Sequence, residues 1–161
     1  MAQEIERKFR VLDDSFKALA YDHTRIEQGY ICSGSGRTVR VRIRGNRGYL
    51  TIKGPSRDGG ISRYEFETEV ALADAQELMQ LCEPGTIQKE RWLVRMADGH
   101  VFEVDEFFGE NEGLVMAEVE LSAADEPFQR PAFLGDEVTG DRRYYNAHLR
   151  RYPYCMWGDA V

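Results

Sequence analysis

Short segments of this chain alternate charged and apolar residues at every second position. The pattern occurs in EIERK at residues 4–8, RVRIR at 40–44, RYEFETE at 63–69 and EVEL at 118–121. Successive side chains of a β-strand point to opposite faces, so each segment would place its charges on one face and its apolar side chains on the other. This alternation restricts the chain to a mainly β fold in which one face of most strands carries charge.

Turn-forming residues divide the chain into segments of this kind, and Gly45-Asn46 and Asp98-Gly99 have the composition of tight hairpins. The predicted strands cover residues 3–11, 25–32, 37–44, 48–54, 62–70, 86–96, 100–107 and 114–122. Helices are predicted at residues 13–20, 74–82 and 141–150. Eight mostly antiparallel strands with a few covering helices predict a mainly β (α+β) single domain over residues 1–161, built as an eight-stranded antiparallel β-barrel or tunnel.

Two interpretations of the charged face are open at this point. Alternation is also typical of an antiparallel sheet with one face in water. Three features favour a charged interior instead: the charged phase is nearly free of serine, threonine and asparagine, like charges cluster strand by strand, and a barrel of this size can hold one small ligand. Because many charges in a dry interior would be prohibitively unstable, such a lumen has to be wet and filled by a ligand.

The charges themselves indicate the class of ligand. Clustered arginine and lysine side chains match phosphate oxygens, and clustered carboxylates match hard divalent cations such as Mg2+ or Mn2+. Both together fit a metal-bound polyphosphate. The chain contains neither a P-loop nor a GxGxxG motif, so side chains rather than a helix N-terminus would bind the phosphates.

Composition argues against several other classes of protein. A net charge of −7 disfavours binding to nucleic acid or to a membrane surface. No apolar run approaches the ~18–20 residues that span a bilayer, and the N-terminal residues lack the apolar stretch of a secretory signal, so we expect a cytoplasmic location. The three cysteines and three histidines are scattered and fit neither a disulfide framework nor a zinc site.

An ordered series of motifs resembles those of the CYTH superfamily, also called triphosphate tunnel metalloenzymes. EIERK is similar to the N-terminal ExExK signature of that family. The further motifs are QGY (28–30), RVR (40–42), TIK (51–53), SRYEFE (62–67), KER (89–91), FEVD (102–105), EVEL (118–121) and VTGDRRYYN (138–146). ExExK alone is a weak pattern, but eight further motifs in the same order cover nearly the whole chain.

The resemblance implies an eight-stranded tunnel that binds a triphosphate and divalent metal. The metal ligands that it implies are Glu4, Glu6, Glu103, Asp105, Glu118 and Glu120, shared between one ion that organises the phosphates and a second that activates water. The implied substrate-binding residues are Lys8, Arg40, Arg42, Lys53, Arg63, Lys89, Arg91, Arg142 and Arg143. Lys8 and Tyr30 are the implied proton-handling pair. Arg142-Arg143 replaces a Lys-Arg pair that is frequent in relatives, and Arg63 with Glu65 and Glu67 has either a binding or a structural role.

The expected function is metal-dependent hydrolysis of inorganic tripolyphosphate to pyrophosphate and phosphate inside the charged tunnel, with Mg2+ or Mn2+ as cofactor. Within the same fold, a class IV adenylyl cyclase or a nucleoside or thiamine triphosphatase would use the same phosphate contacts and add a pocket for the organic group. A non-catalytic polyphosphate-binding module is the third alternative, although such a module gains nothing from the carboxylates. A homodimer remains open, and the expected partner is the triphosphate substrate rather than nucleic acid or membrane.

Overall fold

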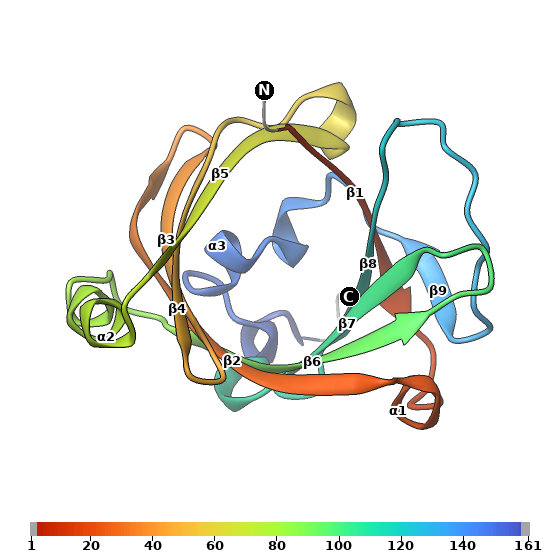
Figure 1. Ribbon diagram of the computed structural model, residues 1–161, viewed down its shortest axis with the longest axis horizontal. Helices are drawn as coiled ribbons and strands as arrows, with labels where there is room; N and C mark the ends of the chain where they lie inside the picture. Colours follow the sequence, from red (N-terminus) through yellow and green to blue (C-terminus); the bar gives the residue numbers. More distant parts are fainter. Residues whose placement is uncertain (1–2, 159–161) are drawn as a thin grey trace.

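The strands close into a barrel. The computed structural model describes residues 3–158, without the side chains of residues 3, 4 and 60. The strands are β1 (Gln3–Val11), β2 (Asp22–Gly34), β3 (Arg37–Arg44), β4 (Arg47–Lys53), β5 (Ser62–Val70), β6 (Ile87–Arg95), β7 (Val101–Phe107), β8 (Val115–Glu120) and β9 (Leu134–Glu137). They run in the order β5-β4-β3-β2-β6-β7-β8-β1-β9, and a β5–β1 pairing closes the first eight into a ring (Figure 1). The predicted eight-stranded antiparallel barrel is confirmed.

The hairpins that fix the register lie where the sequence predicts them. Gly45 and Asn46 join β3 to β4 by a two-residue loop, with Arg44 opposite Arg47. Gly45 has a φ of 60°, the left-handed conformation that such a loop requires and that glycine adopts without strain. Residues 96–100 form the predicted turn between β6 and β7. Because side chains alternate strictly along a strand, these turns decide which phase faces the lumen.

Two of the three predicted helices are shorter in the structure, and the one predicted at 74–82 begins and ends two residues earlier. The helices are α1 (Phe16–Leu19), α2 (Leu72–Gln80) and α3 (Asn146–Leu149), with single 3-10 turns at η1 (Asp58–Gly60), η2 (Gly109–Asn111), η3 (Arg142–Tyr144) and η4 (Tyr154–Met156). The predicted helix at 141–150 is divided in two because Tyr145 is extended, with φ −75° and ψ 132°. The strand β9, which pairs with β1, was not predicted from the sequence. No helix in the described part of the chain is long and apolar enough to cross a membrane.

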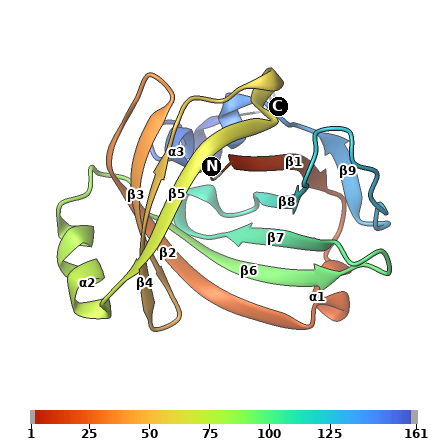
Figure 2. The ribbon, with the colours of Figure 1, turned by 45° about the horizontal axis from the view of Figure 1, so that its top comes forward.

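The first hydrophobic core lies outside the barrel wall. Buried side chains on the outward faces of β1, β6, β7 and β8 pack together with side chains of α1 and of residues 121–134. Figure 2 shows α1 on the outside of the ring of strands. This core comprises Phe9, Phe16, Val94, Phe102, Val104, Ala117, Val119, Leu121 and Phe133. On the opposite side, α2 approaches β4 so closely that a Cβ on Gly48 would lie 2.4 Å from Cβ of Ala75. The apolar phase of the strands therefore faces outward, and the charged phase is left for the lumen.

A second core joins the C-terminal segment to the barrel. Tyr144, Leu149 and Trp157 pack against residues of β6, β7 and β8, among them Ile87 and Met116. In the view along the barrel, the segment that carries α3 is seen within the ring of strands (Figure 1). The C-terminal residues therefore lie across the barrel rather than beside it, and they contribute to its interior.

Residues 121–134, which cover the first core, are attached to the β6–β7 turn through His100. The Nδ1 of His100 lies 3.0 Å from Asp98, and its Nε2 contacts Glu126. Asp98 also accepts a hydrogen bond of 2.7 Å from the backbone N–H of Gln129. The ring of the neighbouring Phe128 meets the outer core edge to face. His100 thus links two carboxylates that come from separate segments of the chain.

We expect the contribution of His100 to stability to disappear as the pH rises. Hydrogen bonds with Asp98 and Glu126 raise the pKa of His100 above its usual 6.5. Hydrogen bonds lower the pKa of Asp98 to about 2, the main one from Gln129, and lower that of Glu126 to about 2, the main one from Ser122. Since the folded state favours protonated His100, its stabilisation is complete below the unfolded pKa and is lost as the pH passes the raised folded value. The difference in melting temperature between the wild type and His100→Gln should be larger near pH ~6 than near pH ~9. A difference that is independent of pH would contradict this assignment.

Candidate functional site

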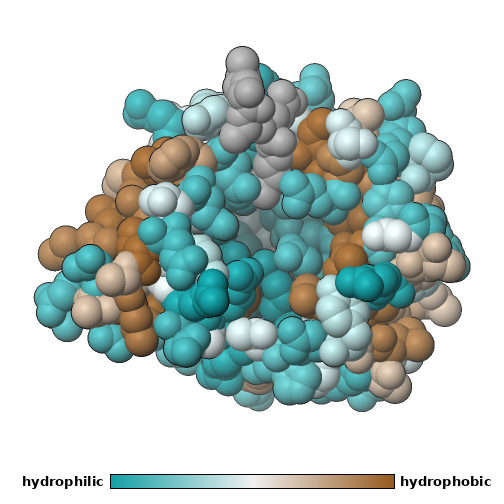
Figure 3. Space-filling model, viewed as in Figure 1, coloured by the Kyte–Doolittle hydropathy of each residue, from teal (hydrophilic) through white to brown (hydrophobic). Residues whose placement is uncertain are grey.

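The lumen contains a cavity of about 740 Å³ with charged walls. In the view of Figure 3, hydrophilic residues surround a hollow at the centre of the molecule. The predicted site residues that line it are Glu6, Lys8, Tyr30, Arg40, Arg42, Lys53, Arg63, Arg91, Glu103, Glu118, Glu120 and Arg142. The structure therefore gathers side chains from all parts of the sequence around one cavity, and the interpretation of the charged phase as an ordinary wet outer face does not apply to these residues.

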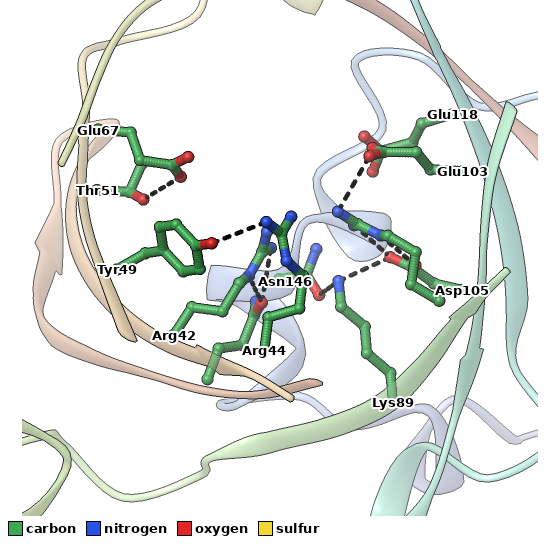
Figure 4. A network of polar contacts seen from close by, with 12 residues as sticks. Arg42, Arg44, Tyr49, Thr51, Glu67, Lys89, Glu103, Asp105, Glu118 and Asn146 are labelled. Atoms are coloured by element: carbon green, nitrogen blue, oxygen red, sulfur yellow. Dashed lines mark hydrogen bonds and ion pairs between the residues drawn. The ribbon is translucent and has the colours of Figure 1, made fainter. Parts of the chain in front are cut away.

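One wall of the cavity is acidic and is built by β1, β7 and β8. Backbone pairing places Glu6 opposite Glu120 and Lys8 opposite Glu118. The next strand adds Glu103, which lies opposite Glu118. Figure 4 shows Glu103 and Glu118 side by side at the cavity wall. The carboxylates thus come from three neighbouring strands, with one lysine among them.

The environment of Glu118 is strongly polarised. Lys8 Nζ lies 3.7 Å from its Oε1 atom. Burial alone would raise the pKa of Glu118, but the charge of Lys8 and a hydrogen bond with Glu6 lower it to about 2. Two carboxyl groups this close repel each other when both are ionised, and a cation between them would relieve that repulsion. The acidic wall therefore favours a bound cation.

The donor chemistry of this wall fits a hard divalent cation. Its ligands would be carboxylate oxygens, with no histidine or cysteine, which is the donor set of Mg2+ and Mn2+. Among the described residues, no three acidic, histidine or cysteine side chains converge closely enough to hold a metal by themselves. Glu4 lies on β1 opposite Arg63, but its side chain is outside the described residues. The wall can therefore supply part of a coordination shell, and the remainder would come from a bound anion and water.

The opposite wall carries cations on β3 and β4, and two of them, Arg40 and Lys53, lie beside carboxylates on β5. Arg40 donates to Thr51 Oγ1 at 3.2 Å and lies 3.7 Å from Glu67. Thr51 in turn donates to Glu67 at 2.8 Å, which fixes that carboxylate (Figure 4). Lys53 lies 3.4 Å from Glu65. Glu65 and Glu67 are therefore partners of the cationic wall.

Arg42 and Arg44 differ from these residues because their partners are neutral. Both guanidinium bonds of Arg42 go to Gln28 Oε1, at 2.9 and 2.8 Å. Arg44 donates to the hydroxyl of Tyr49 at 2.9 Å (Figure 4). Burial, together with the charges of Arg40 and Arg91, lowers the pKa of Arg42 to about 9. Even so, Arg42 is charged at neutral pH.

Asp105 lies behind the cavity surface, where two cations bind it. Lys89 contacts Asp105 Oδ2 at 2.7 Å, and Arg91 donates to both carboxylate oxygens at 2.8 and 2.9 Å. Burial would raise the pKa of Asp105, but Arg91 and Lys89 hold it well below its usual range. Burial lowers the pKa of Lys89 to about 7 despite the attraction of Asp105. Neither Lys89 nor Asp105 lines the cavity. This geometry favours a role for Asp105 in holding Arg91 rather than as an open metal ligand.

The aromatic ring beside Lys8 belongs to Tyr145. Lys8 Nζ lies 4.7 Å from the centre of that ring, and the guanidinium of Arg63 lies 6.0 Å from it. Such distances are within the range of cation–π contacts. Tyr30 also lines the cavity, and its hydroxyl accepts a hydrogen bond of 3.4 Å from Gln28. The predicted pairing of Tyr30 with Lys8 in proton transfer stays a prediction, while Tyr145 is a neighbour of Lys8 that the sequence did not indicate.

Three predicted phosphate-binding arginines occupy different settings. Arg63 donates to the backbone carbonyls of Gly54 and Gly36 at 3.1 and 3.3 Å, so it links the β4–β5 loop to the β2–β3 turn. Arg142 lines the cavity. The neighbouring Arg143 is not among the lining residues, and its guanidinium bonds Asp141 at 2.9 Å. Of the adjacent arginines, only Arg142 is placed to meet a ligand in the cavity.

Some lining residues were not assigned a binding role from the sequence. Arg44 and Thr51 lie in the charged phase of their strands, and Glu65 and Glu67 were expected in the tunnel with either a binding or a structural role; all four line the cavity. The C-terminal segment contributes Tyr145, Asn146, His148 and Arg151 to the lining. No periodic signal marks these four, because they lie in a segment of short helical turns whose position depends on packing against the barrel.

Comparison with known proteins places this architecture in a family. The model of the CYTH domain matches residues 2–145. A protein of Acetivibrio thermocellus named inorganic triphosphatase is 46% identical over 155 residues, covering 96% of this chain and 97% of its own. A protein of Nitrosomonas europaea with the same name is 33% identical over 149 residues, covering 91% and 95%.

A solved structure supports the same relationship. The crystal structure of the inorganic triphosphatase NE1496 superposes with a TM-score of 0.64 at 29% identity, covering 93% of this chain and 95% of that one. The match of the domain model, the two relatives and this fold agree over nearly the full length of the chain. The chain belongs to the CYTH family.

Proposed function

We propose that this protein hydrolyses inorganic tripolyphosphate to pyrophosphate and phosphate in the barrel lumen, with Mg2+ or Mn2+ as cofactor. The observation that carries the proposal is the division of the cavity into an acidic wall, with Glu6, Glu118 and Glu120, and a cationic wall around Arg40 and Arg42. A metal-bound polyphosphate presents both of the charges that these walls would attract. The name shared by the two curated relatives supports the choice of an inorganic substrate.

The cationic wall would bind and orient the phosphates. Arg40 is held by Thr51 and Glu67, and Arg91 is held by Asp105, so the guanidinium groups are in place before the substrate enters. Phosphoryl transfer requires mainly positioning and neutralisation of charge, and fixed cations supply both without reorganisation during the reaction. Lys8, between the acidic wall and Tyr145, would meet the phosphate nearest to the carboxylates.

The acidic wall would hold the cofactor. Glu4 and Glu6 with Glu118 or Glu120 would contribute ligands, and Glu103 lies on the neighbouring strand. When bound, a divalent cation neutralises phosphate charge and lowers the pKa of a coordinated water. The carboxylates of this wall also repel the anion when no cation is bound. We therefore assign the acidic residues to binding the cofactor and the cationic residues to binding the substrate.

We expect phosphate release to depend on a divalent cation. With Mg2+ or Mn2+, tripolyphosphate should be hydrolysed faster than ATP or thiamine triphosphate, and EDTA should abolish the activity. Calcium should inhibit, because its longer and more variable coordination misplaces the reacting groups. The measurement is a phosphate-release assay over these substrates and ions.

Each alternative function has its own outcome in this assay. Faster hydrolysis of ATP or thiamine triphosphate would favour the organic substrates, and cyclic AMP formed from ATP would indicate a cyclase. Binding without turnover of any substrate would favour a polyphosphate-binding module. Full turnover in metal-free buffer would exclude the proposed mechanism.

Glu6→Gln tests whether the acidic wall holds a cation, because glutamine has nearly the same shape as glutamate but no charge. The substitution replaces a carboxyl group that hydrogen-bonds Glu118 with an amide that cannot become a charged ligand of a cation, so we expect activity to fall at least ~10²-fold. The melting temperature without ligand should stay constant or rise, because repulsion between two carboxyl groups is relieved. The control is Arg7→Gln on the same strand: Arg7 contacts Glu137 and lies 5.1 Å from the Phe128 ring, outside the lumen. Its turnover should stay within a few fold, and wild-type turnover in Glu6→Gln would contradict the assignment.

Arg40→Ala tests the cationic wall. We expect the variant to bind tripolyphosphate more weakly and also to turn over more slowly, because the same guanidinium meets charge in the ground state and in the transition state. Arg47→Ala is the control, since Arg47 is 65% exposed beside Glu69 at the β3–β4 turn. Steady-state kinetics of both variants give the comparison. Equal losses at the two positions would show that binding follows overall charge rather than the lumen.

A further inference from the structure

Arg42 differs from the other buried cations of the lumen in the charge of its partner. Among the described residues, each of four lumen cations lies within 4 Å of a carboxylate: Lys8 near Glu118, Arg40 near Glu67, Lys53 near Glu65 and Arg91 near Asp105. Arg42 is buried to the same degree as Arg40, at 8% and 7% exposure, but the group that binds it is the neutral amide of Gln28. The positive charge of Arg42 is therefore less compensated than that of its neighbours.

The geometry of Gln28 is that of a clamp. Gln28 on β2 lies opposite Arg42 on β3 in the backbone register and is fully buried. Its Oε1 atom accepts from both Nε and Nη2 of Arg42, at 2.9 and 2.8 Å. Its amide nitrogen donates to Tyr30 at 3.4 Å, which fixes which end of the amide faces the guanidinium. Gln28 does not itself line the cavity, whereas Arg42 does.

The clamp leaves most of the guanidinium available for an anion. An arginine side chain carries five N–H donors, and Gln28 engages two of them. Burial and repulsion from Arg40 and Arg91 already oppose the charge of Arg42, as its lowered pKa indicates. A carboxylate at position 28 would stabilise this charge in the empty protein. With a neutral amide there, the stabilisation has to come from a ligand.

We propose that Gln28 is a positioning residue: it orients Arg42 toward the lumen with a neutral acceptor and so keeps the guanidinium charge for a polyphosphate anion. The identity of the anion rests on the proposed function, but the division of roles between Gln28 and Arg42 rests on the contacts alone. The charge at position 28, and not only its hydrogen-bonding capacity, determines how strongly the lumen attracts an anion.

Gln28→Glu separates charge from geometry. The carboxylate keeps an acceptor for both bonds to Arg42 and cancels its charge. We expect the dissociation constant for tripolyphosphate, measured by calorimetry in metal-free buffer, to rise at least ~10-fold, the loss expected when one charge-assisted contact is removed. The melting temperature of the empty protein should stay constant or rise, because a buried cation gains a counter-ion. The matched control is Gln88→Glu, the same chemical change at an exposed position of β6, which should leave binding within about twofold of the wild type.

Gln28→Met provides the complementary measurement. It removes the acceptor without adding charge, so two buried N–H groups lose their partner, and we expect both the melting temperature and the affinity for tripolyphosphate to fall. If Gln28 only holds β2 and β3 together, Gln28→Met is destabilised but Gln28→Glu binds tripolyphosphate like Gln88→Glu, and the proposal is overturned. A Gln28→Glu protein that fails to fold also overturns it, because the clamp would then not tolerate a carboxylate.

Calorimetry separates this inference from the proposed activity. A wild-type protein that binds tripolyphosphate without hydrolysing it, and whose affinity falls in Gln28→Glu, contradicts the proposed function and supports the role of Gln28. A wild-type protein that hydrolyses tripolyphosphate, with unchanged affinity in Gln28→Glu, supports the proposed function and contradicts the role of Gln28. A wild-type protein that does not bind tripolyphosphate contradicts both.

Discussion

The structure depends on keeping many charges inside a barrel. Desolvating an ion without a partner costs several kcal/mol, so a lumen of this composition contributes little favourable burial energy of its own. The stabilising apolar contacts accordingly lie away from the charged cavity: on the outer face of the wall, in the core around Phe9, Phe102 and Val119, and in the second core, where Tyr144 and Trp157 of the C-terminal segment pack against the barrel. Here α1 and residues 121–134 cover the outer core, and the C-terminal segment adds apolar packing across the barrel, in place of the apolar interior of other small barrels.

The face of the barrel wall on which each strand side chain lies was the property of the site best predicted from the sequence. Alternation in EIERK, RVRIR and EVEL identifies which side chains share a face, and turn residues such as Gly45 set the register. Those two local properties were sufficient to predict the barrel and most of the charged side chains that the strands contribute to the cavity wall. They worked because a slip of one residue would exchange the charged and apolar faces of a strand, so the sequence has to specify the register strongly.

Pairing between strands could not be predicted in the same way. The alternation shows that Glu103 and Asp105 lie on the same face. It does not show that Asp105 forms ion pairs with Lys89 and Arg91, whereas Glu103 lines the cavity. That distinction depends on depth along the barrel axis, which follows from strand tilt and stagger. Tyr145 lies in the lumen because the chain is extended there and the flanking Tyr144 and Leu149 pack into a core. These are long-range effects with no local pattern.

Separation of the charges into two walls links the binding of cation and anion. A polyphosphate that binds near Arg40 and Arg42 brings negative charge toward Glu6 and Glu118, and a cation at those carboxylates brings positive charge toward the arginines. Either ligand alone is therefore attracted by the wall of opposite charge and repelled by the wall of like charge. Bound together, each ligand compensates the charge that the other brings, so the two should bind cooperatively, with the same coupling free energy in either order of addition. The neutral partner of Arg42 fits this arrangement, because a carboxylate at position 28 would place acidic charge within the wall that has to attract the anion.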